Sequence, residues 1–208
     1  MELNYKTFKE IVNRAEIFLP YSFLLRELIA AKKIKKLSRF SLSDSTILEY
    51  TGASFVDDLK AIKKDYYVVS SFNENLPEHW MRFNDVISEV SMQCKKSIVF
   101  YIPYYDLSLP SYFVDLVSLS IKKKITLYAP EKEYKNSEPE LALKKFKEIG
   151  FECVFARGGE HAKVYLFDDK AALVGSFNFT KNAAYKNREL GVLLFGDEVK
   201  KLQSFMEQ

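Results

Sequence analysis

The chain has 208 residues and a formal net charge of +3, and 48% of its residues are hydrophobic, including 17 Phe and 13 Tyr. This length fits one ordinary domain or one domain with an extension, and this apolar content excludes a globally disordered chain. Two cysteines, Cys94 and Cys153, are too few for a disulfide framework, so we expect buried thiols in a reducing compartment. No run approaches about 18 consecutive apolar residues, which argues against a membrane span and a membrane partner.

The N-terminal stretch lacks the basic start and long apolar run of a signal peptide, since acidic residues occur from position 2. We therefore expect a cytoplasmic protein. Positive charge gathers in four short runs, each of which alone fits a solvated helix face or strand end. Together, and doubled in a dimer, these runs could contact phosphate groups. They span residues 32–36, 60–64, 121–124 and 144–147.

Residues 1–78 are predicted to form a mostly helical N-terminal region of unknown role. Apolar spacing predicts helices over 5–19, 22–37 and 54–64. A polar break over 38–46 fits turns and N-caps, and 66–72 reads as a strand. Helix, helix, helix, strand is an order that a winged-helix DNA-binding module can show, although many small helical caps match it too.

Residues 79–208 are predicted to form an α/β domain. A helix over 78–94 leads into a regular alternation of strands and helices. The strands are expected over 97–104, 124–130 and 151–157, and the helices between them over 111–124 and 138–150. This order argues for a sheet with parallel elements and helices packed on it.

Two strand-like runs, 161–168 and 171–178, flank Asp169 and Lys170. If these two residues form a tight hairpin turn, His161 lies opposite Asn178 and Lys163 lies opposite Ser176. Because side chains alternate along a strand, the four polar groups then share one face. The other face is apolar and suits a core; it carries Val164, Leu166, Ala172 and Val174.

An imidazole, an ammonium, an amide and a hydroxyl on one face suit a phosphate group. Lysine offers positive charge, and Asn and Ser offer donors to non-bridging oxygens. Histidine can attack phosphorus or transfer a proton near neutral pH. Each residue alone is more often structural, but their convergence on one predicted face favours a site. Asp168 leaves that face by alternation, so we expect a structural turn or ion-pair role for it. His79 is interpreted as a structural or surface residue in a helix.

The same residues resemble the signature of the phospholipase D superfamily, which is His-x-Lys, four residues, Asp, six residues and Gly-Ser-x-Asn. The matching positions are His161, Lys163, Asp168, Gly175, Ser176 and Asn178. Glu189 takes the place of an acidic residue that opens a strand beyond the motif. The resemblance covers roughly residues 80–208. It implies a phospholipase-D-like mixed β-sheet flanked by helices, to which the mostly helical N-terminal extension is added.

The motif occurs once, which resembles the short, dimeric, metal-independent nucleases of this superfamily. The resemblance implies a homodimer with the active site at the two-fold interface, DNA as partner and substrate, and no cofactor or metal. His161 of one subunit would form a covalent phosphohistidine, and the partner's His161 would protonate the leaving oxygen. Lys163 and Asn178 would hold the phosphate oxygens with support from Ser176, and Glu189 would orient an imidazole.

Three other interpretations stay open. The domain could serve a regulator that binds without catalysis, although four intact site residues exceed what binding needs. It could act on a lipid or another phosphodiester, although no amphipathic segment points to a membrane. A non-catalytic nucleic-acid-binding protein could use the basic runs and the aromatic stretch 100–106.

Overall fold

The computed structural model describes residues 1–36, 43–72, 76–106, 123–130, 138–156 and 161–207. The chain divides into two compact units, Met1–Lys64 and Asp65–Gln208. The division lies at residue 64 instead of 78 because the strand that follows it belongs to the second unit. That strand, β4 (Tyr66–Ser70), pairs with the antiparallel strand β11 (Leu190–Phe195) near the C-terminus.

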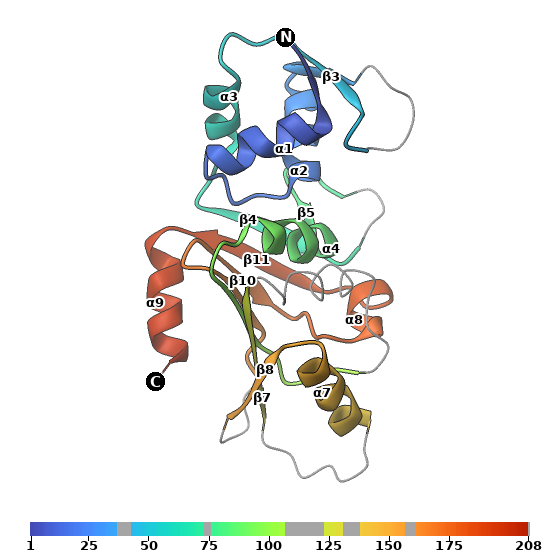
Figure 1. Cartoon of the computed structure of the whole chain (residues 1–208), viewed down its shortest axis with the longest axis vertical. Coiled ribbons are helices and arrows are strands. Elements are labelled where there is room, and N and C mark those ends of the chain that lie inside the picture. Colours follow the sequence, from blue (N-terminus) through green and yellow to red (C-terminus); the bar gives the residue numbers. More distant parts are fainter. Residues whose placement is uncertain (37–42, 73–75, 107–122, 131–137, 157–160, 208) are drawn as a thin grey trace. The chain divides into compact units, whose positions relative to one another are not determined.

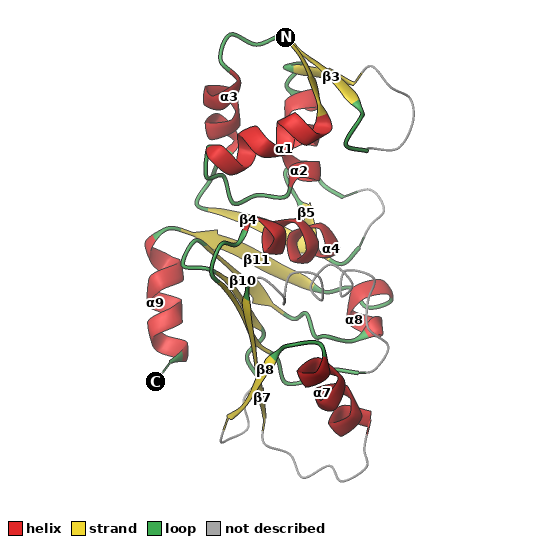
Figure 2. Cartoon of the chain, viewed as in Figure 1, coloured by secondary structure: helices red, strands yellow, loops and turns green. Residues whose placement is uncertain are grey.

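The first unit combines helices with a small antiparallel sheet of order β1-β3-β2 (Figure 2). Its elements are β1 (Glu2–Asn4), α1 (Tyr5–Arg14), α2 (Tyr21–Ala30), β2 (Ile34–Lys36), β3 (Ile47–Tyr50) and α3 (Phe55–Ile62). Asn4 caps α1 by accepting a 2.8 Å hydrogen bond from the Thr7 amide.

The three expected helices are present as α1, α2 and α3, and the strand expected over 66–72 is β4 of the second unit, but the short strands of the first unit were not expected. Strands β2 and β3 separate α2 from α3, and residues 34–36, expected to be helical, pair with β3 instead. Helical periodicity and short strands are difficult to distinguish over three residues, and here the pairing partner decides.

The described strands of the second unit form one eight-stranded mixed sheet of order β5-β4-β11-β10-β9-β6-β7-β8. The additional strands are β5 (Met81–Arg82), β6 (Ser97–Tyr101), β7 (Lys124–Pro130), β8 (Glu152–Ala156), β9 (Val164–Phe167) and β10 (Ala171–Gly175). Strands β6, β7 and β8 are parallel, as the alternating pattern predicted, and β9, β10 and β11 are antiparallel. The helix expected over 111–124 lies almost wholly outside the described residues.

Helices cover both faces of this sheet (Figure 1). One face carries an aromatic core in which Phe83, Tyr165 and Phe177 pack together, and Phe146 of α7 (Glu138–Glu148) contacts Phe179. The helical stretch that carries Phe83 runs as α4 (Phe83–Asp85), a π-helical turn (Val86–Val90) and α5 (Ser91–Gln93).

The other face packs against α9 (Asp197–Met206). The buried cluster there includes Val164, Leu166 and Ala172, with Val174 against it, so the predicted apolar face is confirmed. None of the described helices has the length and apolar character needed to span a bilayer.

Candidate active site

The predicted site residues lie at one edge of the eight-stranded sheet. Backbone pairing places Ser70 beside Leu190, Gly191 beside Gly175, and Val174 beside Val164. The C-terminal ends of β4 and β10 therefore meet the N-terminal starts of β11 and β9 at this edge. The expected site residues lie just beyond these strand ends: His161 and Lys163 before β9, Ser176 and Asn178 after β10, and Glu189 before β11.

The hairpin register differs from the expected one by one residue. Phe167 pairs with Ala171, so the turn contains Asp168, Asp169 and Lys170 instead of two residues. The predicted facing pairs His161–Asn178 and Lys163–Ser176 are therefore wrong, and the carbonyl of Lys163 accepts from the Gly175 amide at 3.2 Å. The four polar residues lie in loops at the same edge of the sheet, not as cross-strand pairs.

Asp168 produces this longer turn. Its φ of 51° is unusual for a residue other than glycine, and Asp is among the residues that tolerate it best. Its carboxylate accepts hydrogen bonds from three successive amides, those of Lys95 (2.7 Å), Lys96 (2.9 Å) and Ser97 (2.9 Å). The expected structural turn role of Asp168 is confirmed: it ties the hairpin to the start of β6.

The Glu189 carboxylate is buried and held at both oxygens. Ser176 donates its hydroxyl to one oxygen, and the Asn187 side-chain amide donates to the other at 3.0 Å. Among the described residues its side-chain partners are these two and no imidazole. The Glu189 amide donates to the Ser71 hydroxyl at 3.0 Å, and that hydroxyl donates to the Asn187 carbonyl at 2.6 Å.

Sequence reasoning missed Ser71 and Asn187. Ser71 lies 118 positions from Glu189 and reaches it only because β4 pairs with β11. No spacing rule connects residues over such a distance. Asn187 stands only two residues before Glu189, but the predicted secondary structure around it gave no reason to assign it a role.

His161 is exposed, and its imidazole lies near an exposed tyrosine. The Tyr104 ring, 45% exposed, stands edge-on to it with 6.0 Å between centroids. Lys163 is half-buried and donates to the His161 carbonyl at 3.0 Å. The side-chain oxygen of Asn178 is buried with no hydrogen-bond partner in the described part of the chain. This oxygen is an acceptor and would need a donor, so only the side-chain nitrogen of Asn178 could donate to a phosphate oxygen.

The motif glycine Gly175 is required by close packing. It pairs with Gly191 across β10 and β11, and a Cβ added to it would lie 2.5 Å from the Leu190 carbonyl oxygen. A Cβ on Gly191 would lie 2.6 Å from the Phe177 ring. Real Cβ atoms do not approach other atoms so closely. The two glycines therefore allow β10, β11 and the Phe177 ring to pack tightly next to Ser176.

The groups at this edge fit an anionic ligand. They comprise an exposed imidazole, an ammonium, a hydroxyl and an amide, backed by a buried carboxylate. Across the described ranges, no three His, Cys, Asp or Glu side chains gather in a way that could hold a metal ion.

Comparisons with known proteins agree with this fold. A family profile described as "Cardiolipin synthase, PLD-like domain" matches residues 87–208. No curated protein sequence matches the chain. The solved structures with a similar fold include the phospholipase D family member Nuc from Salmonella typhimurium, with a TM-score of 0.52 and 21% identity over 68% of this chain and 89% of that one.

Two larger proteins contain the same fold. Phosphatidylserine synthase from Haemophilus influenzae Rd KW20 matches with a TM-score of 0.51 and 18% identity, over 68% of this chain and 37% of its own. Polyphosphate kinase from Porphyromonas gingivalis matches with a TM-score of 0.50 and 16% identity, over 70% of this chain and 26% of its own. Reactions as different as these use one fold, so the fold alone does not name the substrate.

Proposed function

The chain belongs to the family of phospholipase-D-like domains, and we propose that it is a metal-independent phosphodiesterase that hydrolyses DNA as a homodimer. One observation carries this proposal: five of the expected site residues lie just beyond strand ends at a single edge of the sheet, namely His161, Lys163, Ser176, Asn178 and Glu189. The second unit would be the catalytic domain, with the first unit as an added module. The phospholipase D family member Nuc supports this assignment, because the match covers 89% of the Nuc chain.

In the proposed reaction, an imidazole nitrogen of His161 attacks phosphorus and displaces one ester oxygen. The partner subunit's His161 gives that oxygen a proton and later takes one from water, which attacks the phosphohistidine and frees the first imidazole. Lys163 and Asn178 hold the non-bridging oxygens, where negative charge concentrates. Ser176 donates its one hydroxyl proton to Glu189, so it supports the site by holding that carboxylate. Glu189 would orient an imidazole, a contact that the described part of one chain does not contain.

The need for two imidazoles supports a dimer. The chain contains two histidines, and His79 lies outside the motif in the turn before β5, not in a helix as expected. Its φ is 64°, and its imidazole lies 3.7 Å from the Glu78 carboxylate. A single chain thus brings one imidazole to the motif, and a second copy would bring the other.

A lipid phosphodiester is the second candidate substrate. The matching family is described as cardiolipin synthase, and phosphatidylserine synthase shares the fold. The same nucleophile and anion-binding groups would serve a lipid headgroup, so the substrate must be tested directly.

The test is cleavage of plasmid and of labelled oligonucleotide in excess EDTA. The wild type is expected to cut, and His161→Asn is expected to lose the activity. His79→Asn is the matched control, because asparagine tolerates a positive φ and the other histidine stays in place. Denaturing the protein with detergent at alkaline pH during the reaction should leave label attached to the wild-type protein, because a phosphohistidine P–N bond survives alkali and is hydrolysed in acid. Cleavage that EDTA abolishes, or that His161→Asn retains, contradicts the proposal, and turnover of phosphatidylglycerol instead of DNA favours the lipid candidate.

Mixing the two proteins tests the shared site. After subunit exchange, a mixed dimer has one His161 and cannot complete both steps. Activity should therefore fall with the square of the wild-type fraction, whereas a site complete within one chain would lose activity in simple proportion.

A further inference from the structure

A pocket opens beside the candidate active site, between the end of β4 and the start of β11. Its cavity volume is about 280 Å³. Aromatic, basic and apolar side chains line it: Phe72, Trp80, Arg188, Leu76, Pro77 and Leu190. We call it the Phe72 pocket. Ser70 and Glu189 complete the lining, so the pocket adjoins the candidate active site through Glu189.

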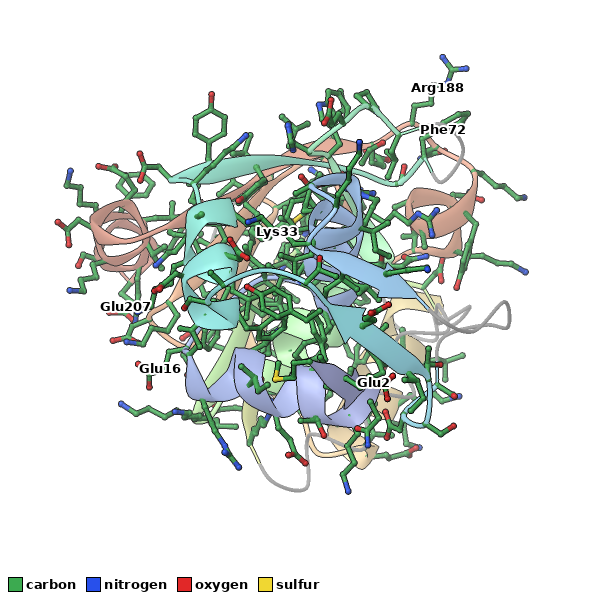
Figure 3. All side chains as sticks on the ribbon, turned by 90° about the horizontal axis from the view of Figure 1, so that it is seen from above. Glu2, Glu16, Lys33, Phe72, Arg188 and Glu207 are labelled. Atoms are coloured by element: carbon green, nitrogen blue, oxygen red, sulfur yellow. The ribbon has the colours of Figure 1, made fainter. Side chains whose placement is uncertain are left out.

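Strand pairing explains why these side chains gather. Leu190, the first residue of β11, pairs with Ser70, the last residue of β4, and just beyond these strand ends Arg188 lies beside Phe72. The Arg188 guanidinium lies over the Phe72 ring, 5.0 Å from its centroid. Figure 3 labels these two neighbouring residues.

The lining suits a flat aromatic ring that is attached to a negatively charged group. Phe72 is 45% exposed although it is a large apolar side chain, and it presents a ring face together with a cation. Aromatic and guanidinium planes are the surfaces on which unpaired bases stack. The cavity is slightly smaller than pockets that hold drug-sized molecules, which fits a single base.

The position relative to His161 fits a neighbouring nucleotide. Going across the sheet, β4 is separated from β9 by β11 and β10, so three strand intervals amount to about 14 Å. A phosphate at His161 and a base in the Phe72 pocket would therefore belong to different nucleotides of one strand. A paired base is held in its stack and does not enter a side pocket without extrusion.

We infer that the Phe72 pocket binds an unpaired base close to the scissile phosphate, so that single-stranded nucleic acid is the preferred substrate. This inference rests on the proposed function, since it assumes a phosphodiester of nucleic acid at the motif. The lipid alternative would place an acyl or headgroup moiety there instead and is separated by the experiment below.

The pocket contains its own reporter. Trp80 is the only tryptophan in the chain, so intrinsic fluorescence reads the pocket directly. We would titrate the His161→Asn protein, which is expected not to cut its substrate, with a short oligodeoxythymidine at a fixed salt concentration. Quenching of Trp80 that saturates with the oligonucleotide is expected. A blunt duplex of equal length should bind more weakly and leave Trp80 emission nearly unchanged.

A matched pair of variants tests the contact itself. Phe72→Ala is expected to weaken oligodeoxythymidine binding by roughly tenfold or more. Phe155 is the control, because it lies on β8 at the other end of the strand order. Like Phe72 it is about half exposed, at 46%, and the Lys147 ammonium lies 5.4 Å from its ring centroid. Phe155→Ala is expected to change affinity by less than about twofold.

Several results would overturn the inference. These are absence of quenching, equal losses in Phe72→Ala and Phe155→Ala, or a Trp80 response to phosphatidylglycerol vesicles and not to the oligonucleotide. Cleavage by the wild type without any Trp80 response would remove the pocket assignment and keep the nuclease. Quenching without cleavage would keep the pocket assignment and remove the nuclease, because the binding experiment needs no turnover.

Discussion

Replacing Asp168 tests whether this motif residue stabilises the fold or takes part in catalysis. Its carboxylate accepts three backbone hydrogen bonds at 2.7–2.9 Å, and two of the three lie in exposed surroundings. Hydrogen bonds to charged groups contribute about 1.5–3 kcal/mol when buried, and less where water can replace the acceptor. With about 1 kcal/mol for each bond and about 1 kcal/mol for a positive φ in alanine, Asp168→Ala should cost about 4 kcal/mol of unfolding free energy.

Asp168→Asn provides the graded comparison. Asparagine tolerates the same φ and keeps one acceptor oxygen, so its expected cost is about 1–2 kcal/mol. Urea unfolding followed by Trp80 fluorescence measures both variants, and Trp80 lies in the same unit as Asp168. In conditions where the protein is folded, Asp168→Asn should keep most of its cleavage rate.

The reasoning fails if both variants unfold within about 0.5 kcal/mol of the wild type. It also fails if Asp168→Asn is fully folded, as judged by circular dichroism, and yet loses cleavage as completely as His161→Asn. That result would give Asp168 a part in the chemistry.

Three further expectations follow. Gly191→Ala should destabilise the second unit by about 1–3 kcal/mol, because its Cβ would lie 2.6 Å from a buried aromatic ring; calorimetry showing an unchanged transition would contradict this. Ellman's reagent should label Cys153 well before Cys94, since burial raises the pKa of both thiols and Cys94 is only 2% exposed; equal rates would contradict it. A tyrosine hydroxyl lowers the pKa of Asp58, so this carboxylate stabilises the first unit above its unfolded pKa and the contribution disappears as pH falls. Asp58→Asn should therefore flatten the acid limb of a circular dichroism titration, and an unchanged limb would refute the assignment.

The motif and the alternating strands could be predicted because both are local. The spacing from His161 to Asn178 spans one hairpin, and residue type alone marks its chemistry. The apolar alternation of Val164, Leu166, Ala172 and Val174 depends only on the two-residue period of a strand, so a register error of one residue left it correct.

The hairpin register itself could not be predicted from the turn residues. Asp169-Lys170 fits a two-residue loop, and only the amides of residues 95–97 make the longer turn favourable by binding Asp168. That interaction joins positions more than seventy residues apart, so its free energy is absent from any local pattern. The same holds for residues 34–36, which are strand because β3 is available to pair with them.

The sequence by itself thus determined which groups are present and in what order: one imidazole, one ammonium and their donors, followed by an acidic residue. Only the tertiary structure decided what surrounds them. Pairing of β4 with β11 places Ser71 behind Glu189 and Phe72 beside Arg188. Long-range strand pairing is stabilised by backbone hydrogen bonds and packing that no single segment contains, which is why these neighbours appear only in the folded chain.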